Sequence, residues 1–227
     1  MTHTLHRLGN PQSLRKDFIV LAIASQIAGP VGSAYKFREF ADIVLKYNPL
    51  NFGDMISGNM FQMDLDTIHA GYCDNSIVHA VFTDEHIVAN VLKELKDADL
   101  GLSIVVSGLL EQTATCCSTA GLKPHTVQYS LGILGRTDLL PQPWVLEMST
   151  MCGHGMVAFS LIIELADRVK DQRITAEEAA QGLARQCHCG VFNPDRATGI
   201  LKRIVTKKSG KTQASKAFEN EHDEALR

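Results

Sequence analysis

The chain lacks the features that direct a protein toward nucleic acid or lipid. Lysine and arginine number 22 against 25 aspartates and glutamates, which gives a formal charge of −3, and the pI is about 6.3. No basic stripe with interleaved aromatic residues occurs, and a weakly acidic chain attracts polyanions poorly. The composition therefore argues against nucleic-acid and membrane-surface partners.

Long apolar runs are also missing. The run Phe18–Ala24 is far shorter than the about 18 to 20 apolar residues that cross a bilayer. Residues Met1–Asp17 carry several basic side chains, but no small-residue cleavage site of convincing form follows, so we interpret Phe18–Ala24 as a strand. We expect a cytoplasmic protein whose 227 residues form one large domain or two small ones.

Strands and helices are predicted to alternate through the first two thirds of the chain. Apolar runs or alternating patterns predict strands at Phe18–Ala24, Ile77–Phe82, Leu102–Val106 and Thr126–Leu134, and amphipathic spacing predicts helices at Ser33–Tyr47, Glu85–Asp97 and Leu109–Ala120. Such alternation with short connections is typical of βαβ units. We therefore expect an α/β fold, with α+β as the other option, built on a mainly parallel or mixed sheet of about four strands.

The C-terminal third is predicted to be helical. Helical periodicity covers Met156–Val169, Thr175–Gln186 and Arg196–Val205, with a capping box at Thr175 and Glu178 and a cap at Asp195. The charged residues that follow are typical of a disordered segment. We predict an α/β domain over residues 1–145, a helical layer or subdomain over 146–205 and a disordered tail over 206–227.

Six cysteines are the chemically informative residues. In a reducing compartment they are more typical of metal binding, catalysis or core packing than of disulfides. Cys73 and Cys116 fit core packing. Two clusters stand out, Met151–Gly155 and Cys187–Gly190, because each places thiols and a histidine beside glycine. Polar, glycine-bearing segments at residues 51–54 and 57–59 could line a pocket.

Cys152 is the strongest single candidate. It precedes a strongly helical run, and a thiol at a helix N-terminus has a lowered pKa, which makes it a nucleophile, a base or a metal ligand near neutral pH. Gly153 and Gly155 would let backbone amides approach an anion closely, and His154 supplies a titratable partner. We therefore expect Cys152 and His154 to be catalytic, with His125 as a further candidate.

The segment Met151–Gly155, followed by a small-apolar helix with Glu164, resembles the thiol-bearing motif of the proline racemase and hydroxyproline epimerase family. The resemblance implies a cofactor-free enzyme in which two opposed cysteines move an α-proton. It covers only a short stretch, and this chain has no Asp-Arg-Ser-Pro-Cys-Gly-Thr-Gly-Thr run, the second element of that family. We interpret the match as a shared way of starting a helix.

The second cluster predicts a metal. Two thiols separated by one residue, Cys187 and Cys189, can bind one metal or one cluster from a turn, and thiolates select zinc, copper(I) or iron–sulfur centres. If helix ends converge, Cys117, Cys152 and one of Cys187 or Cys189 would give three thiolates, with His125 or His154 as a fourth ligand or a proton carrier. Three thiolates on a [4Fe–4S] cluster leave one iron open to substrate, whereas four closed ligands predict a structural zinc.

The sequence thus predicts a cytoplasmic enzyme of lyase or sulfur-transfer type that acts on a small anionic metabolite through a [4Fe–4S] cluster or zinc. The cofactor ligands would be Cys117, Cys152, Cys187 and Cys189. Two alternatives stay open: a cofactor-free two-thiol racemase or epimerase, with Cys187 or Cys189 opposite Cys152, and a non-catalytic metal-binding or assembly protein. A homo-oligomer is compatible with either.

Overall fold

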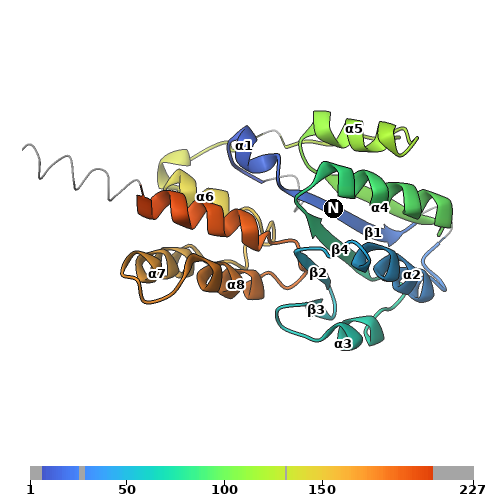
Figure 1. Cartoon of the computed structure of the whole chain (residues 1–227), viewed down its shortest axis with the longest axis horizontal. Coiled ribbons are helices and arrows are strands. Elements are labelled where there is room, and N and C mark those ends of the chain that lie inside the picture. The colour runs from blue at the N-terminus through green and yellow to red at the C-terminus, as the bar shows by residue number, and fades with distance from the viewer. Residues whose placement is uncertain (1–6, 26–28, 131, 207–227) are drawn as a thin grey trace, which may run out of the picture.

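The computed structural model describes residues 7–25, 29–130 and 132–206. Within them, five strands form one sheet in the order β3-β2-β4-β1-β5, and every neighbouring pair is antiparallel. The strands are β1 (Phe18–Ala24), β2 (Asn51–Asp54), β3 (Gly58–Asn59), β4 (Ile77–Phe82) and β5 (Leu102–Ser107). Figure 1 shows the helices α6 to α8 gathered on one side of the molecule and α2, α4 and α5 on the other.

The prediction of a mainly parallel or mixed sheet of about four strands is wrong, and the fold is α+β in character. β1 is the reason, because it pairs with β4 on one side and with β5 on the other: Leu21 faces both His79 and Val105. β4 and β5 therefore run in the same direction and are joined by α4 (Glu85–Ala98), but β1 lies between them. In this split βαβ arrangement, the strand–helix–strand order in the sequence is the same as in a parallel βαβ unit. The two strands nevertheless do not pair with each other, because β1 lies between them.

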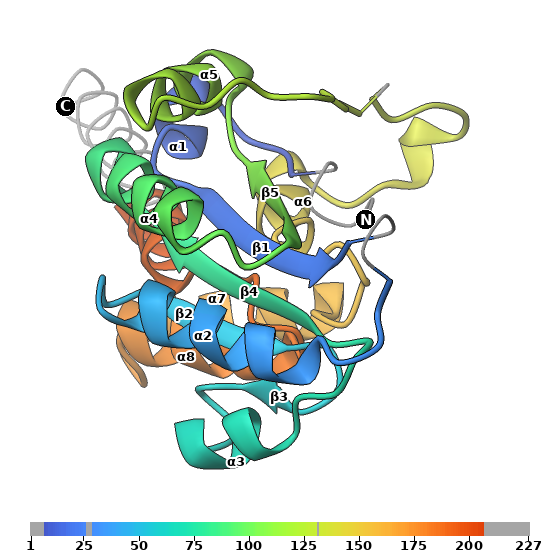
Figure 2. The same cartoon turned by 90° about the vertical axis from the view of Figure 1, so that its right-hand side faces the viewer.

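One face of the sheet is covered by α2 (Ala34–Leu45) and α4, and α5 (Leu110–Thr119) packs beside α4 (Figure 2). The apolar residues that predicted α2 are those it buries, Phe37 and Phe40 among them. Asp84 caps α4, because its carboxylate accepts backbone N–H groups of the first turn. These helices enclose the first hydrophobic core, which includes Phe18 and Val20 of β1.

The opposite face is covered by the helical layer. It consists of α6 (Pro143–Ser149), α7 (Phe159–Lys170), α8 (Ala176–Gln186) and a last helix over residues 194–206. The capping box of Thr175 and Glu178 is present, whereas the last helix is capped by Asn193, which accepts the N–H of Arg196 at 2.9 Å, and not by Asp195. Ile19 and Leu21 belong to this second core. Burial on both faces explains the unbroken apolar run of β1.

Other segments depart from the expectations. The predicted strand Thr126–Leu134 is not formed, and its described residues have no regular structure. Short helices that the sequence did not define occur at α1 (Pro11–Leu14), α3 (Leu65–Ala70) and a 3₁₀ turn (Thr137–Leu139). Most of the predicted tail lies outside the described residues. None of the described helices has the length and apolar character needed to cross a membrane.

Candidate functional site

Three cysteines meet where two loops of the helical layer approach each other. Cys152 follows α6, Cys187 and Cys189 follow α8, and none of the three is more than 1% exposed. The Sγ atoms of Cys187 and Cys189 are 3.9 Å apart, and Cys152 shares a side-chain hydrogen bond with Cys187. The exposed His154 lies beside them, with Nδ1 3.7 Å from Sγ of Cys189. The structure therefore brings together both clusters singled out in the sequence.

The turn Cys187–Phe192 is held by the β2–β3 hairpin. Asn59 donates its side-chain amide to the carbonyl of the first residue of the turn, and Asn51 donates to that of the last, each at 2.9 Å. Gly190 has φ +77°, and a Cβ there would come within 2.7 Å of the backbone N of Gly53. Only glycine fits so close an approach in a left-handed conformation. The polar, glycine-bearing segments expected to line a pocket instead anchor this turn.

Cys152 is not at a helix N-terminus. α6 ends at Ser149, the backbone N–H of Cys152 donates to the carbonyl of Ser149 at 3.1 Å, and α7 does not begin until Phe159. Gly153 and Gly155 lie in the loop between these helices. The helix dipole expected to activate Cys152 is therefore absent, and the thiol lies nearer the negative end of α6.

Arg7 joins the two thiol-bearing loops. Its side chain is 6% exposed, and Nη2 donates to the carbonyl of Met151 at 3.2 Å and to that of Val191. Nη1 of Arg7 pairs with the buried Asp17, which also accepts from Nη1 of Arg196 at 2.8 Å. No local sequence motif marks this network, because most of its members are far apart in the chain.

The three thiols differ in acidity. The hydrogen bond with Cys187, together with burial, raises the pKa of Cys152 far above the ordinary thiol range. For Cys187 the hydrogen bond with Cys152 lowers the pKa, but the hydrogen bond with Cys189 and burial outweigh it and raise the pKa to about 12. The hydrogen bond from Cys187 lowers the pKa of Cys189 against the effect of burial. Among the three thiols, Cys189 is thus the one whose pKa is lowered.

Backbone amides also face the sulfurs. The N–H of Val191 hydrogen-bonds to both Cys187 and Cys189, and the N–H groups of His154 and Met156 hydrogen-bond to Cys152; each of these bonds lowers the pKa of the thiol that accepts it. Such bonds stabilise thiolates, because they favour the charged form. Both loops therefore offer donors to a negatively charged sulfur.

Cys117 and His125 do not join this group. Cys117 lies in α5 and belongs to the first core, across the sheet from the thiol cluster, and burial raises its pKa. Its neighbour Cys116 donates its thiol to the carbonyl of Glu85 at 3.3 Å. His125 is exposed in the segment after α5, where Nδ1 is 3.1 Å from the hydroxyl of Thr126. The predicted four-thiol ligand set is therefore reduced to three cysteines.

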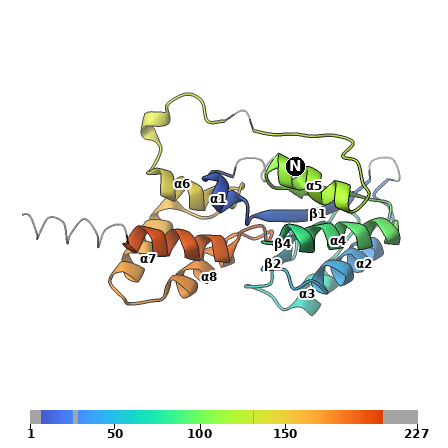
Figure 3. The ribbon, with the colours of Figure 1, turned by 45° about the horizontal axis from the view of Figure 1, so that its top comes forward.

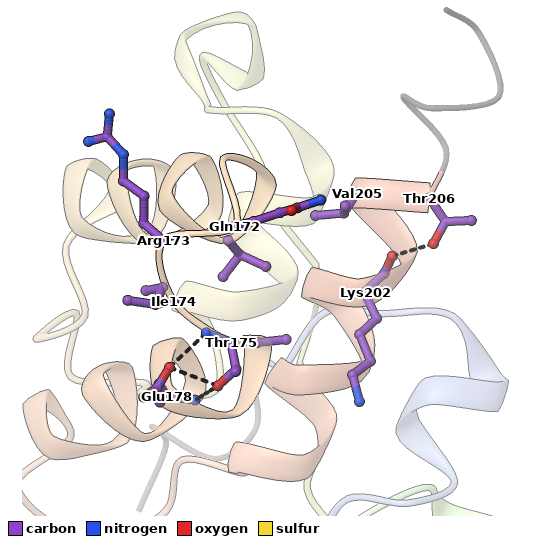
Figure 4. A pocket seen from close by; sticks show the side chains of 10 residues that line it. Gln172, Arg173, Ile174, Thr175, Glu178, Lys202, Val205 and Thr206 are labelled. Carbon is purple, nitrogen blue, oxygen red and sulfur yellow. Dashed lines mark hydrogen bonds between the residues drawn. The ribbon is translucent and has the colours of Figure 1, made fainter. Parts of the chain in front are cut away.

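A separate hollow of about 480 Å³ lies between the α7–α8 connection and the last helix (Figure 4). Two of its charged groups already have partners: Glu178 accepts from the backbone and hydroxyl of Thr175, and Lys202 pairs with Glu177. The third, Arg173, points away from the other lining residues in Figure 4. Figure 4 shows the capping box on the wall of this hollow. The hollow is therefore a gap between two helices of the helical layer, and its charged groups are not arranged for chemistry.

As the side chains stand, the described residues contain no group of three or more histidine, cysteine, aspartate or glutamate side chains arranged to hold a metal ion. Comparison of the chain with protein-family models, with curated proteins and with solved structures finds no match. The local resemblance at Met151–Gly155 thus extends to no wider similarity.

Proposed function

We propose that the protein binds one thiophilic metal ion, best fitted by zinc, through Cys152, Cys187, Cys189 and His154. The observation that carries the proposal is the convergence of three buried thiols and an imidazole from two loops separated in sequence. Buried cysteines usually pack against apolar side chains, whereas these contact one another and backbone N–H groups. Zinc with three thiolates and one imidazole is a common coordination set.

The spacing favours a single ion over an iron–sulfur cluster. Two thiolates on one tetrahedral zinc, each about 2.3 Å from the metal, are about 3.8 Å apart, and a thiolate and an imidazole nitrogen are about 3.6 Å apart. The corresponding distances are 3.9 Å for Cys187 to Cys189 and 3.7 Å for Cys189 to His154. Cluster ligands bind different irons and stand farther apart. Because the four groups do not point at one centre as they stand, binding of the ion would require their side chains to rotate.

Burial divides the ligands into two kinds. The three cysteines are enclosed by the second core, but His154 is on the exposed loop after α6. Catalytic zinc sites combine three fixed protein ligands with one exchangeable position. We therefore propose that His154 is the exchangeable ligand, and that a small anionic metabolite coordinates the metal in its place as the substrate of a lyase or transferase reaction.

A second candidate is metal-free thiol chemistry, which the contact between Cys189 and His154 favours: a thiol and a base within reach of each other are the core of a nucleophilic site. A racemase mechanism is less well supported. It requires two thiols on opposite sides of the substrate, whereas the three thiols here are buried and interact with one another.

Metal analysis tests the proposal. Protein purified under reducing conditions should contain about one zinc per chain, and cobalt(II) substitution should give the intense absorption of a tetrahedral thiolate site. Cys189→Ser should abolish both signals, whereas Cys116→Ser, a buried thiol of the other core, should keep them. Iron with an equal amount of sulfide would overturn the single-ion proposal. A metal-free protein in which Cys189 alone is rapidly alkylated would favour the thiol enzyme.

A further inference from the structure

A large cavity runs along β5, the last strand in the order of the sheet. β5 is an edge strand, because among the described strands only β1 pairs with it. The cavity has a volume of about 1010 Å³ and is lined by all six residues of β5 and by the segment 122–130. Figures 2 and 3 show the chain after α5 passing on the β5 side of the sheet. The volume is at the upper end of the range for pockets that bind small ligands.

The outer edge of β5 offers backbone groups for pairing. In an antiparallel pair, the N–H and C=O groups of alternate residues point away from the partner strand. Within the described residues, the backbone groups of Leu102–Val106 bond only to β1. Their outward N–H and C=O groups therefore face the cavity without a protein partner, and a purely apolar ligand in the cavity would leave them unsatisfied.

β5 also lacks the features with which edge strands usually avoid further pairing. Its sequence, Leu-Ser-Ile-Val-Val-Ser, contains no charged residue and no proline. Its register with β1 continues from Leu102 to Ser107 without a bulge. Such an edge is a template for another strand, so β5 can accept one more.

The walls of the cavity lie on both faces of the sheet. On the face of the first core they are apolar and consist of side chains from α4 and β5: Leu92, Leu95, Leu102, Ile104 and Val106. On the face of the second core the lining includes Ile23 and, from β5, Ser103 and Val105. A strand added to an edge places successive side chains on opposite faces, so it would contact both sets of residues. The lining thus fits an extended chain better than a compact ligand.

The segment 122–130 limits what can pair with β5. It lines the same cavity from outside the sheet, so the edge strand of another folded domain could not reach β5 without displacing it. A single extended chain can occupy the space between them. The six residues of β5 correspond to about 20 Å of strand, which is the length of a peptide of about five or six residues.

None of the charged residues that line the cavity lies on β5. Arg7 is paired with Asp17, and Lys96 donates to the backbone carbonyls of Ala120 and Gly121. β5 and the apolar walls beside it carry no charge. A charged side chain placed there would lose its hydration without gaining a partner. An uncharged peptide is therefore favoured.

The geometry points to a site for a short uncharged peptide, which binds in extended form as a strand added to β5, between β5 and the segment 122–130. Alternate residues of the peptide would be large and apolar, because they face Leu102, Ile104 and Val106. The residues between them would be small, because they face Ser103 and Ser107. None of the residues proposed to bind the metal lines the cavity, so this site does not rest on the proposed function.

Peptides methylated at backbone nitrogen atoms test the pairing. Calorimetric titration with acetyl-Thr-Val-Thr-Val-Thr-amide should show binding. In an extended chain, the N–H groups of the valines and those of the threonines point to opposite edges. N-methylation of both valines blocks one edge, and N-methylation of the last two threonines blocks the other. The peptide blocked on the edge that faces β5 loses its hydrogen bonds and should bind at least about tenfold more weakly than the other. No binding of the unmodified peptide, or equal binding of the two methylated peptides, would overturn the proposal.

Two exposed valines provide matched variants of the protein. Val127 lines the cavity and is 60% exposed, whereas Val31 is 90% exposed and does not line it. Val127→Asp places a charge beside the bound peptide and should weaken binding several-fold, whereas Val31→Asp should keep the affinity. Thermal unfolding of both variants shows that the fold is kept, and equal affinities would contradict the proposed site. Cys189→Ser should lose zinc and still bind the peptide, which separates failure of the metal site from failure of this one.

Discussion

Cysteines are buried on both faces of the sheet, but their surroundings differ. Cys116 and Cys117 lie inside α5, where the backbone amides are used by the helix, and burial raises the pKa of both. On the other face, Cys152 and the Cys187–Cys189 turn lie in loops, where amides remain available and the sulfurs contact one another. Burial alone therefore does not mark a site. A site is marked where several buried thiols lie in loops and converge.

The largest effect that separates the two faces should come from metal removal. Binding to the folded chain stabilises it in proportion to affinity, so chelation should lower the free energy of unfolding by several kcal/mol. In Cys189→Ser, chelation should change nothing, whereas Cys116→Ser should respond like the unmodified chain. Thermal unfolding with and without a chelator measures this. Equal responses of the two variants would remove the proposed difference between the faces.

The next effect concerns the ionic network behind the thiol loops. Asp17 is buried and accepts from Arg7, Arg196 and Asn193, so Asp17→Asn leaves buried guanidiniums unbalanced and should cost about 4 kcal/mol. The control is Asp138→Asn, whose pair with Arg136 is exposed on both sides and should cost less than about 1 kcal/mol. Urea unfolding gives both values. Similar costs would contradict the structural importance of this network.

Gly190 tests how tightly the thiol turn is held. In Gly190→Ala the new Cβ meets the backbone of Phe52 and Gly53 at 2.7 to 2.8 Å, and φ is +77°. We expect a loss of about 3 kcal/mol, from backbone strain and overpacking together, and weaker metal binding. Gly155→Ala has a similar φ, +69°, but open space around the Cβ, and should cost only about 1 kcal/mol. Similar losses would show that the close approach to β2 is unimportant.

The sequence predicted what depends on local patterns. The apolar run Phe18–Ala24 predicted a strand, and the capping box of Thr175 and Glu178 marked one helix start correctly. It could not predict strand direction, because nothing in the residues of α4 says that β1 lies between the strands it joins. The alternation in Thr126–Leu134 predicted a strand, but an alternating segment forms one only where it reaches a sheet edge, and the cavity separates this one from β5.

The site was predictable to a similar degree. Cysteine and glycine at the ends of two helices indicated loops with available backbone groups, and those loops do meet. The error at Cys152 came from treating Gly153–Gly155 as the start of α7, whereas they extend the loop. Arg7 and Asn59, which hold the loops together, gave no signal, since their partners are more than a hundred residues away in the chain.

The smallest effect concerns the thiols of the first core. Burial, followed by the nearby carboxylate of Glu85, raises the pKa of Cys116 to about 11 from an ordinary value of 9.0. Between those pH values the unfolded chain has lost this proton and the folded chain keeps it, so stability falls as the pH rises. Metal-bound thiolates on the other face do not titrate in this range. In zinc-loaded protein, the urea midpoint of Cys116→Val should therefore fall less between pH 9 and 11 than that of the unmodified chain. Part of the fall should remain, because the pKa of Cys117 is also raised. An undiminished decline in this variant would show that Cys116 does not titrate as its surroundings require.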